Sequence, residues 1–327
     1  MENKNKQQCN SVPSNRLQFF PIMMFAVVMG LSGLTIIFQK AEEVFGMKGG
    51  LGYILAQIDT VLFISILLVY IAKSIKYFKE VKEEFSHPVR INFFAAAAIS
   101  FLLISIVYHP INHNIAFYCF AIGTAMQTFF TLYTISYWIN KNMEIKHSNP
   151  AWFIPIVGNV LVPVAGAGMA DVNLLMYYYS IGLFFWIVLT SILINRIIFH
   201  HQMAVKFIPT LFIFIAPPAV AFIAYIKMYG QFDMFASILY NLALFFSFLL
   251  IFMYKNFLKL KFFISWWAFT FPLAAVTIAS ILAYKITNIE IYSYFSYFFM
   301  VVTTLVVLIV AVKTVLHMFK KEICIAE

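Results

Sequence analysis

Apolar runs of about 20 residues recur along almost the whole chain, and each is long enough to cross the roughly 30 Å hydrocarbon core of a bilayer as a helix. Short connections separate the ten runs that we count: 19–38, 51–72, 91–108, 115–138, 151–169, 174–194, 207–226, 233–254, 262–284 and 291–312. Apolar residues make up 63% of the chain and charged residues only 11%, which lies outside the range of soluble domains. The sequence therefore predicts an all-α integral membrane protein with ten transmembrane helices.

The distribution of lysine and arginine predicts the orientation of these segments, because positive residues near helix ends are retained on the cytoplasmic side. With the N-terminus inside, 18 of the 22 lysine and arginine residues fall in inner segments. The four on the outer side are Lys40, Lys48, Lys227 and Lys285. We therefore expect a multi-pass protein of the inner (plasma) membrane, with cytoplasmic tails over 1–18 and 319–327 and a pore domain over 19–318.

The net charge and the cysteines add little beyond this topology. The formal charge of +9 follows mostly from the inner lysines and arginines, so we expect contacts with membrane lipids and small anions and no nucleic-acid partner. Three cysteines do not indicate a disulfide framework. The N-terminus has no short apolar stretch followed by a cleavage site, so we expect the first apolar run to remain as a helix.

Proline residues in or beside the ten segments fall only in the first, fifth, seventh and ninth. They are Pro21, Pro155, Pro163, Pro209, Pro217, Pro218 and Pro272. Proline bends a helix, and the carbonyls that it frees must face protein or water rather than lipid. The odd-numbered segments are thus predicted to form an inner ring and the even-numbered segments an outer ring, although the third segment offers only the small residues 95–98. The alternative is that proline is simply common in membrane helices.

An inner ring of five parallel helices, each followed by a returning outer helix, is a bundle of five helical hairpins around a central axis. This arrangement indicates a pore. No odd-numbered segment carries an acid, a lysine or an arginine in its middle. A pore without charge favours passive permeation of small anions, because coupling to protons needs a titrating group in the path.

Five stretches resemble the tellurite-resistance/dicarboxylate transporter family, which includes the bacterial tellurite-resistance protein A and the plant guard-cell slow anion channels. They are FFPIMMFAVVMGLSGL in the first segment, YFKEVKEEFSHPVRINFF leading into the third, NPAWFIPIVGNVLVP in the fifth, APPAVAFIAY in the seventh and SWWAFTFPLAAVTIAS in the ninth. The resemblance implies quasi-fivefold symmetry, a central pore through each subunit, and a homotrimer. Because the family covers both channels and carriers, a coupled carrier or exporter of C4-dicarboxylates or tellurite-like oxyanions stays open as the alternative function.

The resemblance also implies where the pore closes. In that family a phenylalanine of the ninth helix blocks the pore, in an aromatic–small–Phe pattern that places it at Phe271 here. A ring directed across the axis forms a hydrophobic plug that ions cannot wet. The alternative is that Phe271, one of 38 phenylalanines, only packs in the core.

Other residues of the odd-numbered segments are candidates to line the pore or to kink its helices. They are Phe25, Ala26, Pro155, Pro217 and Pro272. Ala26 stands where the family usually has glycine after phenylalanine, and its added methyl leaves the width of the pore at this point open.

The deepest ionisable group is Asp59, eight residues into the second segment. We interpret it as a carboxylate near the interface that is bonded to a neighbour such as Gln57 or Thr60, and the competing interpretation is a coupling role. The charged stretch 79–90 could form a helix at the membrane surface, but an ordinary loop is the simpler expectation.

A membrane-embedded enzyme is the competing class of protein. The sequence contains no H-E-x-x-H, G-x-S-x-G or G-x-x-x-x-G-K motif and no pair of acids within the membrane. We therefore expect no catalytic residue and no cofactor. His109 and His113 have a spacing that could hold a metal, but Pro110 disfavours the helix that would align them. A solvated outer loop without a metal is the expectation.

Overall fold

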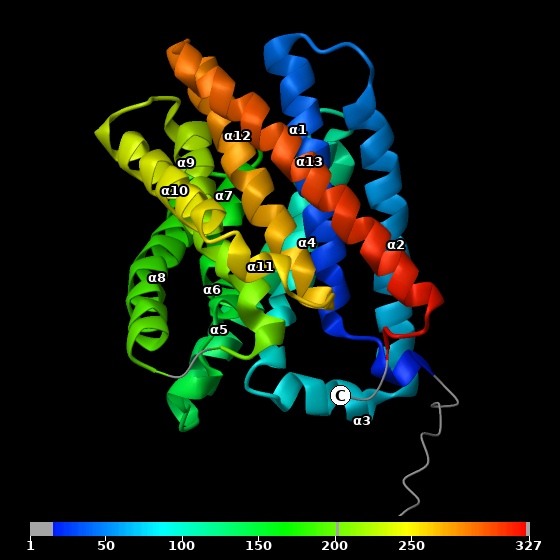
Figure 1. The fold of residues 1–327 in the computed structure, drawn as a ribbon. Coiled ribbons are helices and arrows are strands. Elements are labelled where there is room, and N and C mark those ends of the chain that lie inside the picture. The colour runs from blue at the N-terminus through cyan, green and yellow to red at the C-terminus, as the bar shows by residue number, and fades with distance from the viewer. Residues whose placement is uncertain (1–15, 201–202, 325–327) are drawn as a thin grey trace, which may run out of the picture.

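The computed structural model describes residues 16–200 and 203–324, and these residues form helices and turns without a strand among them. Most of the predicted N-terminal tail, 1–15, and the last residues, 325–327, lie outside the described residues. Figure 1 shows long helices running side by side, with the short helix α3 (Phe78–Ser86) lying across one end of the bundle. This end is termed the lower end, and the opposite end the upper end.

Nine helical segments of the described chain are long and apolar enough to cross a membrane. Their main helices are α1 (Phe25–Phe45), α2 (Leu51–Lys76), α4 (Ala95–Tyr108), α5 (His113–Asn140), α8 (Val172–Phe199), α9 (Ala216–Tyr229), α10 (Met234–Phe252), α12 (Thr270–Thr287) and α13 (Glu290–Phe319). The fifth predicted segment is present only as a shorter apolar stretch over Pro150–Gly166. It is divided into η5 (Pro150–Trp152), α6 (Phe153–Val157), η6 (Gly158–Val160) and α7 (Leu161–Gly166).

The other four odd-numbered segments each begin as a 3-10 helix and continue as an α-helix. In these segments η2 (Ile22–Met24) precedes α1, η3 (Arg90–Phe93) precedes α4, η7 (Val205–Ile215) precedes α9, and η8 (Ile264–Phe269) precedes α12. Pro217 and Pro272 therefore lie in the first turn of an α-helix, where a missing N–H breaks no intrahelical hydrogen bond. The third segment shows the same change of helix type without a proline. Proline positions alone therefore do not identify every segment that changes from a 3-10 helix to an α-helix.

Burial separates the odd-numbered segments from the even-numbered ones. The most apolar windows of the four long odd-numbered segments are 72% to 94% buried, whereas those of the five even-numbered segments are 28% to 39% buried. Helix α1 contacts α4 and α12, α9 contacts α12 and α7, and α4 contacts α7. These five helices thus form a closed circuit of contacts. Large apolar side chains dominate the exposed faces of the other helices, as contact with lipid requires.

Polar side chains of α5 form hydrogen bonds with backbone and side-chain groups of the interrupted fifth segment. The carbonyl of Pro155 accepts hydrogen bonds from Gln127 Nε2 and from Thr131 Oγ1, each at 2.8 Å. Asn159 Nδ2 donates to Thr131 Oγ1 at 2.8 Å and to the carbonyl of Ile156 at 2.7 Å. Because water is absent from the bilayer core, these bonds supply the partners that the broken helix loses.

The stretch that we expected to be an ordinary loop contains α3, so that expectation is wrong. Glu84 of α3 is buried, and its Oε2 lies 2.7 Å from Nζ of Lys73 near the end of α2. Its Oε1 accepts a hydrogen bond from the backbone N–H of Ile22 at 3.0 Å. Glu84 therefore joins α3 to α2 through the ion pair and to the beginning of the first segment through the hydrogen bond from Ile22.

Both described ends of the chain lie at the lower end of the bundle, close to α3 (Figure 1). A guanidinium nitrogen of Arg16 donates there to the backbone carbonyl oxygen of Lys321, at a distance of 3.5 Å. An even number of crossings would bring the two ends to the same side in this way. Short helices in the remaining connections are η1 (Arg16–Phe19), η4 (Ile145–His147) and α11 (Lys255–Leu258).

Candidate functional site

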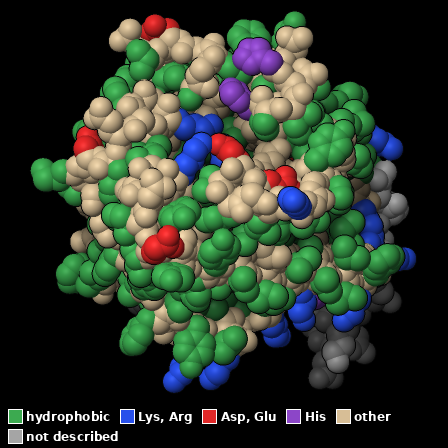
Figure 2. All heavy atoms as spheres, turned by 90° about the horizontal axis from the view of Figure 1, so that it is seen from above, with side chains coloured by type: hydrophobic (Ala, Val, Ile, Leu, Met, Phe, Trp, Pro, Cys, Tyr) green, Lys and Arg blue, Asp and Glu red, His purple; other side chains and the backbone are tan. Residues whose placement is uncertain are grey.

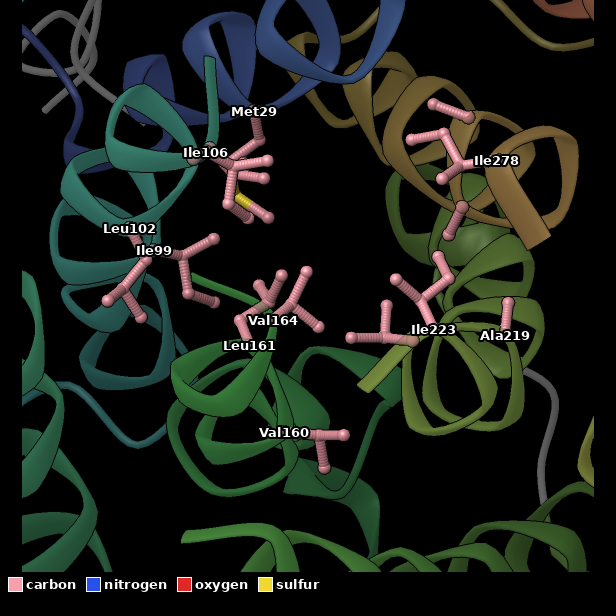
Figure 3. Packing of buried hydrophobic residues seen from close by; sticks show 14 of the residues in the cluster. Met29, Ile99, Leu102, Ile106, Val160, Leu161, Val164, Ala219, Ile223 and Ile278 are labelled. Atoms are coloured by element: carbon pink, nitrogen blue, oxygen red, sulfur yellow. The ribbon is translucent and has the colours of Figure 1, made fainter. Parts of the chain in front are cut away.

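Two cavities lie inside the circuit of odd-numbered segments, one above the other. The lower cavity measures about 80 Å³ and is lined by residues from all five segments, including Met29, Ile99, Val157, Pro217 and Phe271. The upper cavity measures about 30 Å³ and is lined from the same helices nearer their upper ends, by residues such as Ile36, Ile106 and Ile278. Figure 3 shows Met29, Ile106, Leu161, Val164 and Ile223 pointing into the common space between the helices.

Three residues line both cavities and so separate them. They are Leu161 of α7, Val220 of α9 and Phe271 of α12. All three side chains are apolar, and each comes from a different helix of the circuit. The two cavities are thus separated by a hydrophobic partition in which Phe271 is the largest side chain.

The lower cavity offers little polar surface to an ion. Thr210 and Ser265 supply hydroxyl groups to its wall. Each of these donates to a backbone carbonyl, Thr210 Oγ1 to Phe207 at 2.6 Å and Ser265 Oγ to Lys206 at 2.5 Å. The donor proton of each hydroxyl is therefore already used within the protein.

Three aromatic residues of SWWAFTF, Trp267, Phe269 and Phe271, anchor the start of α12 or line the cavities. Trp267 Nε1 donates to Thr314 Oγ1 of α13 at 2.9 Å, and Phe269 packs edge-on against Phe212 and Phe257. Phe271 is half-buried, and among the described residues it pairs with no other aromatic ring. Trp267 and Phe269 thus hold the start of α12, Trp267 also lines the lower cavity, and Phe271 lines both cavities.

Glycines of α1 allow α12 to approach closely enough to place Phe271. A Cβ atom at Gly30 would lie 2.2 Å from Oγ1 of Thr270, and a Cβ atom at Gly33 would lie 2.7 Å from Cβ of Ala274. The nearest atom of Phe271, Cδ2, would be 3.7 Å from the Gly33 Cβ, which is an ordinary contact distance. The ring of Phe271 therefore packs against Gly33, where there is no side chain.

Gly33→Ala is expected to destabilise the protein by about 1–3 kcal/mol, the usual effect of forcing an extra carbon into a packed interior. The clash is with Ala274, so the double variant Gly33→Ala/Ala274→Gly should recover part of the loss. Thermal unfolding in detergent measures both variants. Additive effects of the two substitutions would contradict this packing, because residues in contact are expected to be coupled.

The predicted pore residues fall into two groups in the structure. Ala26, Pro217, Phe271 and Pro272 line the lower cavity together. Phe25 does not line either cavity; its ring packs edge-on against Tyr70 of α2, with centroids 6.0 Å apart.

Pro155 lies away from the cavities as well. The neighbours Ile154 and Val157 line the lower cavity, whereas Pro155 turns its carbonyl to α5.

Sequence reasoning missed several residues of this site. Leu161 and Val220 gave no signal, because they are ordinary apolar residues in apolar segments. Lys40 and Lys227 were assigned to outer loops, yet both line the upper cavity. The signal that could have found them is their position within one turn of the ends of the first and seventh apolar runs.

Asp59 has a different partner from those we expected. Ser32 Oγ of α1 donates to Asp59 Oδ2 at 2.6 Å, whereas Thr60 bonds to the carbonyl of Ala56 and meets Tyr108. The carboxyl group is buried between α2 and α1 and lines neither cavity. It therefore lies outside both cavities, between α1 and α2.

The two histidines of HPINH lie near each other at the upper end, with ring centroids 6.2 Å apart. Within the described ranges, no group of three or more histidine, cysteine, aspartate or glutamate residues could hold a metal ion. The pKa of His109 lies below its usual value, first because the ring is partly buried and then because Lys227, His113 and Lys40 are close.

Comparison of the sequence with known proteins identifies the family of this chain. Residues 19–315 match the model of the SLAC1 family, described as a voltage-dependent anion channel. The S-type anion channel SLAH2 of Arabidopsis thaliana is 30% identical over 270 residues, which are 80% of this chain and 52% of the plant protein. The chain thus spans about half the length of that relative.

Two microbial proteins match over most of both lengths. An uncharacterized transporter of Methanocaldococcus jannaschii is 28% identical over 303 residues, which are 85% of this chain and 89% of that protein. The tellurite resistance protein TehA homolog of Haemophilus influenzae is 25% identical over 282 residues, which are 85% of this chain and 86% of its own. The family match extends from the start of the first segment into the last helix, α13, and the resemblance noted in the sequence is confirmed. The chain is an integral multi-pass membrane protein, and it belongs to the SLAC1 family of voltage-dependent anion channels.

Proposed function

We propose that the protein conducts small anions through a hydrophobic pore along the axis of each subunit, and that Phe271 closes this pore. In this proposal the interrupted fifth segment also crosses the membrane, which gives ten crossings in five hairpins with quasi-fivefold symmetry. The observation that carries the proposal is the pair of cavities on the axis, separated by Leu161, Val220 and Phe271. A hydrophobic constriction of this kind blocks ions by excluding water.

The lining predicts which anions pass most easily. Among the described residues, no acidic residue lines the two cavities, and the only basic residues that line them, Lys40 and Lys227, present their apolar carbon chains to the upper cavity. An apolar pore cannot replace the hydration shell of an ion, so anions that lose water easily should pass best. Nitrate and iodide are therefore expected to pass more readily than chloride, and fluoride least.

Ion flux into liposomes that contain the purified protein tests this proposal. The expected order is iodide and nitrate above chloride and chloride above fluoride, without a requirement for a proton gradient. The Haemophilus relative carries tellurite resistance in its name, so a carrier of tellurite-like oxyanions or C4-dicarboxylates is the second candidate. Uptake that stops when the proton gradient is collapsed would overturn the channel proposal in favour of this carrier.

We also propose that both termini are cytoplasmic and that the protein lies in the inner (plasma) membrane. The tails 1–18 and 319–327 would then face the cytoplasm, beside the lysine-rich connections of the lower end. The homotrimer implied by the sequence resemblance stays a proposal, and the mass of the detergent-solubilised protein measured by light scattering tests it. A mass equal to one or two subunits would contradict the trimer.

Cysteine labelling tests the orientation. In a variant without the native cysteines, a cysteine in place of Asn112 is expected to react with a membrane-impermeant maleimide from outside, because Asn112 is exposed at the upper end. A cysteine in place of Lys259 is exposed at the lower end and is the matched control, expected to react only after permeabilisation. The reverse pattern would show that the orientation is inverted.

A further inference from the structure

A groove on the outer surface of the bundle follows one face of α8 in its upper half. It measures about 480 Å³, and its walls come from α8, from the end of α9 and from the start of α10. The lining residues of α8 recur at the spacing of one helix face, and they are Met176, Tyr179, Ser180, Leu183, Phe184 and Ile187. Tyr225 and Tyr229 of α9 and Phe235 of α10 complete the lining. Only 28% of the most apolar window of α8 is buried in the protein, so this surface meets the bilayer.

The length of the groove matches one leaflet of a bilayer. From Met176 to Ile187 an α-helix rises roughly 16 Å, and half of the hydrocarbon core is about 15 Å thick. A helix of that length and about 10 Å across occupies roughly 1,300 Å³, whereas the groove offers about 480 Å³. The space therefore suits one extended acyl chain and is too small for a helix of a second subunit.

Aromatic rings gather at the upper end of the groove, where α9 ends and α10 begins. The ring centroids of Tyr225 and Tyr229 are 5.1 Å apart, and those of Tyr225 and Phe235 are 5.2 Å apart. The connection that joins the two helices stands at the upper end of the bundle (Figure 1). Tyrosine is common at the boundary between the bilayer core and the headgroups, and aromatic faces attract ammonium groups that come within about 6 Å of the ring centre.

The charge beside these rings is negative. Asp233 is exposed, and its carboxylate accepts from the backbone N–H of Ala236 at 2.9 Å and from Tyr225 Oη at 2.5 Å. These two hydrogen bonds hold the pKa of Asp233 below its usual value, so the group is charged at neutral pH. None of the described residues that line the groove is a lysine or an arginine, and Lys227 of α9 donates instead to the carbonyl of Val164. Figure 2 shows lysines near the middle of the upper face, whereas acidic side chains also lie toward its left side, the side of α9 and α10 in Figure 1.

We propose that this groove binds a phospholipid whose headgroup carries an ammonium group, as ethanolamine and choline lipids do. One acyl chain lies along α8 between Met176 and Ile187, and the ammonium group lies over the rings of Tyr225 and Tyr229 beside Asp233. Because lipid tails are as apolar as the groove, the tail gains only close packing, and the headgroup decides which lipid binds. An anionic lipid would bring a negative charge to Asp233 without an ammonium group to offset it. This inference rests on the membrane location of the chain and is independent of anion conduction.

Native mass spectrometry of the purified full chain tests the headgroup site with dioleoyl phosphatidylethanolamine and dioleoyl phosphatidylglycerol, which differ only in the headgroup. The ethanolamine lipid is expected to bind about threefold more tightly, the factor for a cation–π contact at an exposed site. Asp233→Asn should remove most of this preference, and asparagine keeps the N-cap of α10, so the fold is retained. Glu290→Gln is the control, because Glu290 is an exposed acid on α13 outside the groove lining, and it should leave the preference unchanged.

Filling the groove tests the position of the acyl chain. Ser180→Trp places an indole in the groove and should remove one bound lipid per subunit. Ser191→Trp is the matched control, because Ser191 is an exposed serine of α8 outside the groove lining, and it should retain that lipid.

Two results would overturn the proposal. Equal binding of the two lipids that Asp233→Asn leaves unchanged would show that there is no headgroup site. If Ser180→Trp retains the bound lipid, the acyl chain lies elsewhere, and a smaller oligomer in that variant would identify the groove as a contact between subunits.

Discussion

Replacing Phe271 with alanine is expected to raise the chloride current by at least about tenfold, which corresponds to removing roughly 1.4 kcal/mol from the barrier. The physical reason is that Phe271 lines both cavities, so truncation of its ring joins them into one path. Phe271→Leu should raise the current less, because leucine keeps an apolar side chain at the partition. Currents are measured under voltage clamp on purified protein in planar bilayers.

The fold should survive this substitution. Phe271 is half-buried and pairs with no other aromatic ring in the described chain, so its loss should cost less than the roughly 3–5 kcal/mol of a buried phenylalanine-to-alanine change. Selectivity should stay anionic, because the lysines that border the path are unchanged.

Phe269→Ala is the matched control, two residues away on the same segment. Phe269 is buried and packs against Phe212 and Phe257, so its truncation should destabilise the protein without increasing the current. If Phe271→Ala is as silent as the wild type while it remains a folded oligomer, then Phe271 is a packing residue. The barrier would then have to lie with Leu161 and Val220, or the pore would need an opening signal.

Much of the architecture could be predicted from the sequence, because lipid and protein surroundings impose different compositions. The apolar runs located the long helices, and the segments that carry proline are buried, although the third segment, which has none, is the most buried at 94%. The change from 3-10 to α-helix could not be predicted, since both helix types have similar backbone angles and the same apolar composition. Pro155, Gly158 and Pro163 indicate the interruption of the fifth segment, because proline and glycine disfavour a continuous helix.

The wall of the cavities was predicted less well, because it depends on the rotation of each helix. Successive residues of an α-helix point about 100° apart, so Phe25 turns to Tyr70 while Ala26 lines the lower cavity. Hydropathy also locates an apolar window rather than a helix end. Helix α1 continues to Phe45 and α9 to Tyr229, and this brings Lys40 and Lys227 to the upper cavity instead of to a loop.

Glu84→Gln is expected to lower the free energy of unfolding by about 3–5 kcal/mol, the usual effect of removing one partner of a buried ion pair. The side chains of Lys73 and Glu84 are only 4% and 6% exposed, and their charged atoms are 2.7 Å apart. Glutamine leaves the ammonium group of Lys73 without a counter-charge. Removing the buried negative charge of Glu84 should therefore lower the stability more than the loss of one hydrogen bond, which contributes about 0.5–1.5 kcal/mol.

Glu83→Gln is the control, because Glu83 is the exposed neighbour on α3 and has no ion pair within the described residues. It should change stability by less than about 0.5 kcal/mol, as expected for a surface substitution. Thermal unfolding in detergent, followed by tryptophan fluorescence, compares the two variants at one pH and one salt concentration.

The double variant Lys73→Met/Glu84→Gln separates charge from shape. Methionine removes the unpaired ammonium group, and glutamine at 84 can still accept from the N–H of Ile22, so part of the lost stability should return. Recovery should be incomplete, because Lys73 Nζ also donates to the carbonyl of Phe20 at 2.8 Å, and that carbonyl then loses its partner. If Glu84→Gln unfolds at the same temperature as Glu83→Gln, the ion pair does not hold α3 to α2, and the anchoring of α3 must come from the aromatic contacts of Phe85 with Phe94 and Tyr133.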